Sequence, residues 1–592
     1  MSQKRADVEE KYKWDLSLVL DSDESFLELI NKVQSRIPEL ESFRGKLNTK
    51  EDIVRYFELN REIELIIGQV SLYAFLRYES DSLDPESAKM VSRVDSLCVK
   101  LSSATSFVQS ELSTLDDEFL IKLRDDGDLK DYDRIFEDIL KRKPHTLTPQ
   151  EEKLVSEMGA FSDVGAVFDM LTDNELVFEP IVDIEGRELP HNHSTYGAYV
   201  RSESREVRRD AHIKHHKAFA SINKTLAINY INQLKKSDFF RKTYKYDSTI
   251  EMRLFNEEVE KEVYDSLIKS VNKYLKYFYK FVNVKAKSLG QSDFEISDAY
   301  APLGNADKYK LSYENAYALV EEALSVLGEE YLSVLKKAKT DRWIDVFYNE
   351  GKRSGAFSIS SETGNPFVML NYKETYNDIS TIAHEMGHAM HSYFSEKHQP
   401  HEKCNYVIFV AEISSIVNEI LSFKHLLKQE ADKETRKFLI SSFLENFYAT
   451  VFRQSMFSEF EYFAHNKINE DEPISFDDLN NYYQGLLEKY FGKDTIIHEF
   501  AKFEWSRIPH FYRPFYVFKY ATGYISALAI VENIERGGKT AVDNYLKFLS
   551  SGCSKKPSEL LKIAGVDILD ENTFEKAFEY YNKMIYELEK LI

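Results

Sequence analysis

The stretch TIAHEMGHAMHSYF, residues 381–394, constrains the fold of this chain more than any other segment. Successive residues of an α-helix are about 100° apart, so His384, His388 and His391 would project from one helical face. Apolar side chains form a stripe beside that face: Ile379, Ile382, Ala383, Met386, Met390 and Tyr393. The pattern predicts a buried helix whose polar edge lines a cavity.

His384, Glu385 and His388 have the spacing of the HExxH motif, in which two imidazoles bind one metal ion and the glutamate activates water. The alternative is a surface helix with unrelated histidines, but this leaves their shared face unexplained. The long metzincin form of the motif would require Gly at 391 and His at 394, where this chain has His391 and Phe394. The segment therefore predicts a metal site outside that class. Spacing alone allows either His384 with His388 or His388 with His391 as the pair, and the position of Glu385 favours the first. His391 is then expected to lie behind the ligands or to line the cavity.

A catalytic zinc site needs a third protein ligand and an open position for water. The downstream candidates are His398, His401, Glu402, Glu412 and Glu419. The first three fall in SEKHQPHEKCN, which looks like a surface loop, whereas FVAEISSIVNEILSF is an apolar helix with two acids on one face. Burying a carboxylate is costly unless it pairs or binds a cation. Glu412 is therefore the preferred ligand, and Glu419 is expected to orient an imidazole or to form a structural ion pair. This His₂Glu set favours zinc.

A second pair of histidines with helical spacing, His212 and His216 in DAHIKHHKAF, serves as an internal comparison. No glutamate follows His212, and the surrounding side chains are strongly basic: Arg205, Arg208, Arg209, Lys214 and Lys217. Because these charges would repel a cation, we expect a solvated helix face here. The HNH sequence at 191–193 is expected to be a loop.

Composition indicates a mainly helical protein, since the 592 residues include few Gly (21) and Pro (13) and many periodic Lys/Glu-rich stretches. The net charge of −22 argues against nucleic acid or an anionic membrane as a partner. The start, MSQKRADVEEKYKW, has no apolar core of a signal peptide, and no apolar run reaches the roughly 18 residues of a membrane span. Three scattered cysteines form no disulfide framework. A reduced, cytoplasmic protein is expected.

The helical period is interrupted between residues 341 and 372, just before the histidine helix. DVFYNEGKRSGAFSIS and NPFVMLNY are typical of strands joined by a turn at residues 362–366. This pair is either a structural hairpin or an edge along which a peptide could lie, held by backbone hydrogen bonds that are independent of its sequence.

Several segments together carry a family resemblance. GKRSGAFSIS, NPFVMLNYKETYNDISTIAHEMGHAMHSYF, FVAEISSIVNE and WSRIPHFYRPFYVFKYATGY resemble the thimet-oligopeptidase-like zinc peptidases, and most closely their bacterial branch, oligoendopeptidase F. The opening KWDLSLVL and the closing CSKKPSELLKIAGVDI also fit this branch. The resemblance implies a mainly α, two-lobed helical shell around a deep channel, with zinc on its floor and a small β-sheet next to the zinc helix.

The resemblance also implies a division of the chain and a set of roles. It suggests an N-terminal helical region at 1–112, a small N-terminal domain of the oligoendopeptidase F type at 113–185 and a catalytic domain at 200–585. It makes His384, His388 and Glu412 the ligands of one Zn²⁺ and Glu385 the catalytic base. Assisting residues in the C-terminal motif map to His510, Tyr512, Tyr516 and Tyr520.

The predicted function is therefore a cytoplasmic zinc endopeptidase that hydrolyses short oligopeptides, with Glu385 as general base. In this mechanism a tyrosine hydroxyl or His510 would stabilise the oxyanion. Two alternatives stay open: a related carboxypeptidase or dipeptidase that trims peptide ends, and a catalytically inactive peptide-binding homologue.

Overall fold

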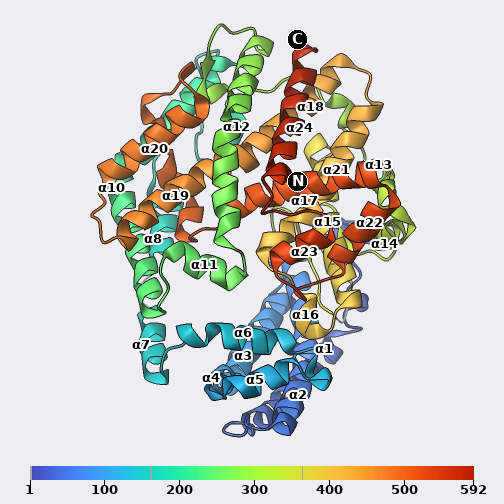
Figure 1. Ribbon diagram of the computed structural model, residues 1–592. Coiled ribbons are helices and arrows are strands. Elements are labelled where there is room, and N and C mark those ends of the chain that lie inside the picture. The colour runs from blue at the N-terminus through green and yellow to red at the C-terminus, as the bar shows by residue number, and fades with distance from the viewer. Residues whose placement is uncertain (1–2, 160–162, 363–364) are drawn as a thin grey trace. The chain divides into compact units, whose positions relative to one another are not determined.

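The computed structural model describes residues 3–159, 163–362 and 365–592. In them the chain is mainly helical, as predicted, and contains three small sheets (Figure 1). It divides into two compact units, each built from non-consecutive stretches. Unit 1 comprises residues 1–146, 309–422 and 530–565, and unit 2 comprises 147–308, 423–529 and 566–592. The three consecutive segments expected from the sequence stay a prediction, and so do the enclosing shell and its channel.

Unit 1 contains the N-terminal helices and the histidine helix. Its helices are α1 (Asp23–Glu41), α2 (Lys50–Ser80), α3 (Pro85–Thr105), α4 (Phe107–Thr114), α5 (Asp117–Arg124), α6 (Asp133–Arg142), α13 (Tyr313–Ala323), α14 (Gly328–Thr340), α15 (Tyr376–His398), α16 (His401–Cys404), α22 (Lys539–Leu549) and α23 (Pro557–Ile563). Helix α17 (Ile408–Gln429) begins in this unit, and α21 (Phe518–Gly537) ends in it.

The sheet of unit 1 has the order β4-β6-β5, with β4 at Ile344–Asp345, β5 at Phe357–Ile359 and β6 at Phe367–Met369. Strand β6 pairs antiparallel with β5 and parallel with β4. The predicted strand pair is therefore confirmed, and β5 is an edge strand. The centre of its turn, residues 363–364, lies outside the described residues. Phe367 and Met369 of β6 join the hydrophobic core of helices α1–α6, and α15 packs on β5 and β6.

Unit 2 contains the long helices α10 (Arg205–Thr243) and α12 (Lys261–Ser288), which are easily followed in Figure 1. The others are α7 (Pro149–Gly159), α8 (Val164–Asp169), α9 (His193–Tyr199), α11 (Thr249–Glu257), α18 (Lys433–Phe447), α19 (Arg453–Asn469), α20 (Phe476–Phe491) and α24 (Glu571–Glu589). Two two-stranded sheets complete the unit: β1 (Ile181–Val182) with β2 (Glu188–Leu189), and β3 (Phe294–Glu295) with β7 (Thr495–Ile496). Across the described residues, no helix is long and apolar enough to cross a membrane.

Candidate metal centre

Helix α15 carries the HExxH residues and begins with a reciprocal cap. The Thr375 N–H donates to Asp378 Oδ2 at 2.8 Å, and the Asp378 N–H donates to Thr375 Oγ1 at 3.3 Å. This capping box satisfies two backbone donors that the first helical turn leaves free. The helix then runs without a break to His398, so His384, Glu385 and His388 are held on a rigid element.

Helix α17 approaches α15 closely at Gly387, the glycine of HEMGH. A Cβ atom at Gly387 would lie 2.5 Å from Ser415 Cα and 2.6 Å from the Ser414 carbonyl oxygen. Asn418 of α17 adds a tie, because its Nδ2 donates to the Ala383 carbonyl at 3.1 Å. Ser414, Ser415 and Asn418 are fully buried. Small and polar residues therefore let the two backbones come close enough for acids on α17 to face histidines on α15.

His384, His388 and Glu412 converge on one point, where their ligand atoms all lie within 4.8 Å of one another. His384 Nε2 lies 3.2 Å from His388 Nε2, and each of these nitrogens lies 3.5 Å from Glu412 Oε2. Donors bound at about 2.1 Å to one tetrahedral ion lie about 3.4 Å apart. The three atoms thus have the separations that such an ion requires.

The environment of the donors also suits a catalytic cation. The side chains of His384, His388 and Glu412 are 29%, 20% and 30% exposed, so one side of the group stays open to a further ligand. Burial would raise the pKa of Glu412, but its hydrogen bond to His388 and the two imidazoles outweigh burial and lower the pKa. Glu412 is therefore ionised near neutral pH, as a metal ligand must be.

Glu419, one of the open sequence candidates, faces His384 from the other side of the ring. Its Oε1 lies 2.5 Å from His384 Nδ1, and its Oε2 accepts from Ser380 Oγ at 3.2 Å. Burial would lower the pKa of His384, but the bond to Glu419 and its charge raise the pKa to about 9. The carboxylate holds a proton on Nδ1, which leaves Nε2 as the nitrogen that would give up its proton to bind a metal ion.

Glu385 lies between the two imidazoles in sequence and is almost fully buried. Burial, the largest effect, raises the pKa of its carboxyl, although the charges of His384 and His388 act in the opposite direction. A carboxyl with a raised pKa, next to a site where a cation could bind, is suited to accepting and returning a proton.

The remaining histidines and acids of this region make other contacts. The His391 ring is buried and stacks on Tyr406 with centroids 3.7 Å apart, so it packs in the core rather than lining an open cavity. His401 Nε2 lies 2.8 Å from Glu64 Oε2, and Glu402 accepts from Arg61. His398 Nδ1 lies 2.8 Å from the Phe394 carbonyl. None of these residues belongs to the donor group found among the described residues.

The predicted assisting residues of the C-terminal motif lie in unit 2. The rings of His510, Tyr516 and Tyr520 form one group, with centroids 5.4 to 6.0 Å apart. Tyr512 lies elsewhere in the unit, where its hydroxyl accepts from Asn229 Nδ2 at 3.1 Å. The catalytic roles of all four residues stay predictions. Within unit 2, Tyr512 is not part of the group that the other three rings form.

The interpretation of His212 and His216 as a solvated face is wrong, because both side chains are buried. His216 Nδ1 lies 2.8 Å from the His212 carbonyl, and burial lowers the pKa of His216 to about 4. The nearby arginines do not repel the pair into solvent, because they pair with acids: Arg208 donates to Asp298 at 2.6 Å. The expected loop at 191–193 ends at His193, which begins α9.

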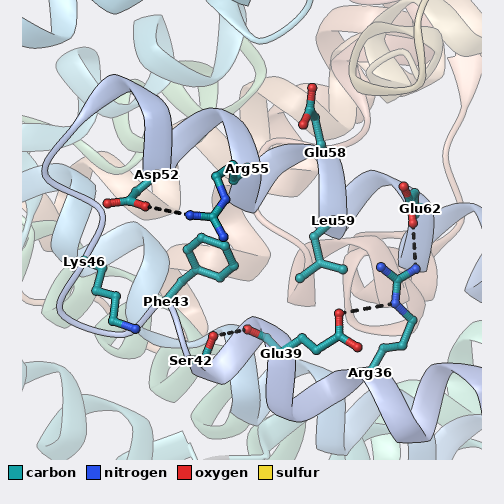
Figure 2. Close-up of a pocket in the computed structure, with 10 residues that line it drawn as sticks. All are labelled: Arg36, Glu39, Ser42, Phe43, Lys46, Asp52, Arg55, Glu58, Leu59 and Glu62. Atoms are coloured by element: carbon teal, nitrogen blue, oxygen red, sulfur yellow. Dashed lines mark hydrogen bonds and ion pairs between the residues drawn. The ribbon is translucent and has the colours of Figure 1, made fainter.

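A hollow of about 480 Å³ on the face of α1 and α2 was not anticipated (Figure 2). Its charged side chains largely neutralise one another, since Arg36 pairs with Glu62 at 2.6 Å and Arg55 with Asp52 at 3.5 Å. None of the candidate metal ligands lines it.

Two family models match parts of the chain. Residues 198–580 match the model of peptidase family M3, and residues 111–178 match that described as oligopeptidase F. The chain is 36% identical to an oligoendopeptidase F homolog of Borreliella burgdorferi, over 99% of each chain. It is 35% identical to oligopeptidase PepF of Bacillus subtilis, over 99% of this chain and 88% of that protein.

Two solved structures are similar over nearly their whole length. A peptidase described as putative, from Chlamydophila abortus, shares 32% identity and superimposes with a TM-score of 0.95, covering 100% of both chains. Oligoendopeptidase F from Enterococcus faecium shares 28% identity with a TM-score of 0.71, covering 96% of this chain and 98% of that one. Together with the family match over most of its length, these likenesses show that the chain belongs to peptidase family M3, in its oligoendopeptidase F branch.

Proposed function

We propose that the protein is a zinc-dependent endopeptidase that hydrolyses short peptides in the cytoplasm, with one Zn²⁺ per chain. The observation that carries this proposal is the triangle of His384 Nε2, His388 Nε2 and Glu412 Oε2, with Glu385 on the same helix. Two nitrogens and one carboxylate oxygen, open on one side, suit Zn²⁺ in a catalytic site. The names of the relatives support peptides as substrates.

Each residue of α15 and α17 has a distinct role in this proposal. His384, His388 and Glu412 hold the ion, and Glu419 keeps His384 in the right tautomer. When bound, zinc supplies Lewis-acid polarisation of the peptide carbonyl and acidifies a water molecule. Glu385 accepts the proton of the attacking water and returns it to the departing amine. Its burial favours this exchange, because burial raises the pKa of the carboxyl and so makes it a stronger proton acceptor.

The aromatic group of unit 2 is proposed to supply hydrogen-bond donors to the oxyanion. His510, Tyr516 and Tyr520 are half-buried and close to one another, which suits donors fixed in advance of the reaction. Tyr512 is the weakest member of the predicted set, since its hydroxyl is already bonded to Asn229. A Tyr→Phe change at a true donor should lower kcat by about 10²-fold.

The edge strand β5 is proposed to bind substrate backbone. Its residues, Phe357–Ile359, are half-buried, and β6 covers only one of its edges. A peptide added as a further strand would be held mainly by main-chain hydrogen bonds, so many sequences would be accepted. We also propose the sequence-based division into 1–112, 113–185 and 200–585 as the evolutionary modules of the chain.

Glu385→Gln tests the proposed chemistry. The variant should keep its zinc and its fold but lose hydrolysis by about 10³-fold or more, because the amide cannot accept the proton. Glu402→Gln is the matched control: it removes an acid that the sequence left open as a ligand but that lies outside the donor group, and it should keep both zinc and turnover. Unchanged turnover in Glu385→Gln would refute the mechanism and the assignment of Glu385.

Peptides blocked at both ends separate the proposed function from end-trimming. An endopeptidase should cut them internally, and mass spectrometry of the products would locate the cleavage. If blocked peptides stay intact while free ones lose terminal residues, a carboxypeptidase or dipeptidase is the correct assignment. If neither class is cut by zinc-loaded protein that binds peptides, the chain is an inactive homologue.

A further inference from the structure

The aromatic group of unit 2 depends on a sharp bend between a short 3₁₀ helix, Pro509–Tyr512, and helix α21. His510 lies before the bend, whereas Tyr516 and Tyr520 follow it. The chain turns at Phe515, whose φ of +56° lies in the left-handed region. Bulky residues rarely adopt this conformation without support from their surroundings. Contacts with the surrounding structure must therefore stabilise the left-handed conformation of Phe515.

Helix α19 provides that support through one face. Phe457 and Phe460 pack against Phe511, with ring centroids 5.8 and 5.1 Å apart, and so anchor the chain before the bend. Glu461, the next residue on the same face, accepts the Phe515 N–H on Oε1 at 2.7 Å. Helix α19 thus contacts the C-terminal motif at two points, Phe511 before the bend and Phe515 within it.

The bond between Glu461 and Phe515 is enclosed. Glu461 is 1% exposed and Phe515 is 2% exposed, so water does not compete for the N–H. A buried backbone N–H without an acceptor is strongly unfavourable. The phenyl ring of Phe515 is enclosed by Tyr264 and by His465, whose centroid is 5.1 Å away. Glu461 therefore satisfies the backbone N–H of the strained residue.

We propose that Glu461 is a positioning residue, which fixes the bend at Phe515 and thereby brings Tyr516 and His510 together for the reaction. This proposal rests on the proposed function of the aromatic group. Glu461 does not touch that group itself; it acts through the backbone of Phe515. Without the acceptor, the bend would relax toward an ordinary conformation, and the ring of Tyr516, the next residue, would move.

Two substitutions of Glu461 separate the acceptor from the rest of the side chain. Glu461→Gln keeps an amide oxygen for the Phe515 N–H, and it is a close mimic because burial raises the pKa of Glu461 to about 8, so that the acid is mostly uncharged near neutral pH. Glu461→Met keeps a similar length but removes the acceptor. Misplacing a reacting group by about 1 Å can cost about 10²-fold in rate. We expect kcat to fall by about 10- to 100-fold in Glu461→Met, with KM changed by less than about 3-fold, and both to be nearly normal in Glu461→Gln.

Glu459→Met is the matched control on the same helix. Glu459 accepts from Asn272, Lys489 and Tyr490, so its loss should destabilise unit 2 at least as much. Because it makes none of its hydrogen bonds to residues 509–520, kcat per bound zinc should stay within about 3-fold of the native value. An equal fall of kcat in both Met variants would overturn the proposal, since it would reduce Glu461 to a general contribution to stability.

A readout independent of activity completes the test. With 3-fluorotyrosine placed at position 516, the ¹⁹F resonance of the folded protein should shift or broaden in Glu461→Met and stay unchanged in Glu461→Gln and Glu459→Met. An unchanged resonance in Glu461→Met would overturn the positioning role. A shifted resonance with normal kcat would support positioning and would instead count against the catalytic role proposed for the aromatic group.

Discussion

Replacing Gly387 with alanine tests whether the packing of α15 on α17 sets the geometry of the metal centre. The added Cβ would lie 2.5 Å from Ser415 Cα, 2.6 Å from the Ser414 oxygen and 2.7 Å from the Ser415 nitrogen. All three are backbone atoms, so no side chain can rotate away. Ordinary contact begins near 3.4 Å, and the helices must therefore separate by about 1 Å.

That separation would act directly on the donor triangle. Glu412 Oε2 is 3.5 Å from each imidazole nitrogen, already near the spacing of about 3.4 Å that a tetrahedral ion requires. With a further 1 Å, at least one donor could no longer approach zinc to about 2.1 Å. We expect the affinity for zinc to fall by about 10²-fold or more. The metal-free protein should suffer less, because overpacking costs about 1–3 kcal/mol while alanine favours the helix by about 1 kcal/mol.

The assay is a zinc titration against a competing chelator, together with thermal denaturation of the metal-free protein. Gly485→Ala in α20 is the control, since a Cβ there would have no atom within 4 Å among its described neighbours. It should bind zinc normally and melt at the same or a higher temperature. If Gly387→Ala binds zinc as tightly as the native protein, the close approach of the two helices does not control the site.

Three further outcomes are expected. Glu419→Gln should weaken zinc binding by about 10- to 100-fold in the chelator assay, and Ser380→Ala, which spares the Glu419–His384 contact, should weaken it less. Chelation should abolish hydrolysis with little loss of helical circular dichroism; global unfolding would instead mark the site as structural. Glu362, which faces His401 at 3.3 Å, has its pKa lowered to about 2, and the pKa of His401 is raised to about 10. The pair should stabilise the protein fully between pH about 4.5 and 6.5. This stabilisation should decrease in acid, as Glu362 is protonated, and in base, as His401 loses its proton. In His401→Gln, the melting temperature should therefore depend less on pH below and above this window.

The sequence was sufficient for the parts of the site that lie on single helices. The positions of His384, Glu385 and His388 follow from helical spacing, and α15 is a helix over the whole motif. The cost of burying acids in an apolar helix predicts special roles for Glu412 and Glu419, and both face His384 in the structure. Local periodicity and the cost of burying charge are thus sufficient to predict the three residues of the candidate donor group.

Contacts between elements that are distant in sequence could not be predicted in the same way. Gly387 is required because the backbone of Ser415 in α17 leaves no room for a Cβ atom. The sequence gives only an indirect sign of this contact: a glycine inside a helix costs about 1 kcal/mol, so its presence indicates close packing against another element. The third strand of the small sheet, β4, was not predicted as a separate strand, because only its second residue, Asp345, falls in the single strand predicted for the segment that ends in β5. Tyr512 shares helical spacing with Tyr516, yet the bend at Phe515 breaks the helix between them.

The two histidine pairs show why spacing alone does not identify a metal site. His384 and His388 lie opposite Glu412 and Glu419, and the net effect is a pKa for His384 raised to about 9. His216 has the same spacing from its partner on α10, yet burial, only partly offset by the charge of Glu504, lowers its pKa to about 4. The neutral imidazole is the form that binds a metal ion, so protonation state alone does not separate the two pairs. The difference is the donor group, because among the described residues only His384, His388 and Glu412 bring three ligand atoms together. Acids on a neighbouring helix, more than the histidines themselves, therefore decide which pair can hold a cation.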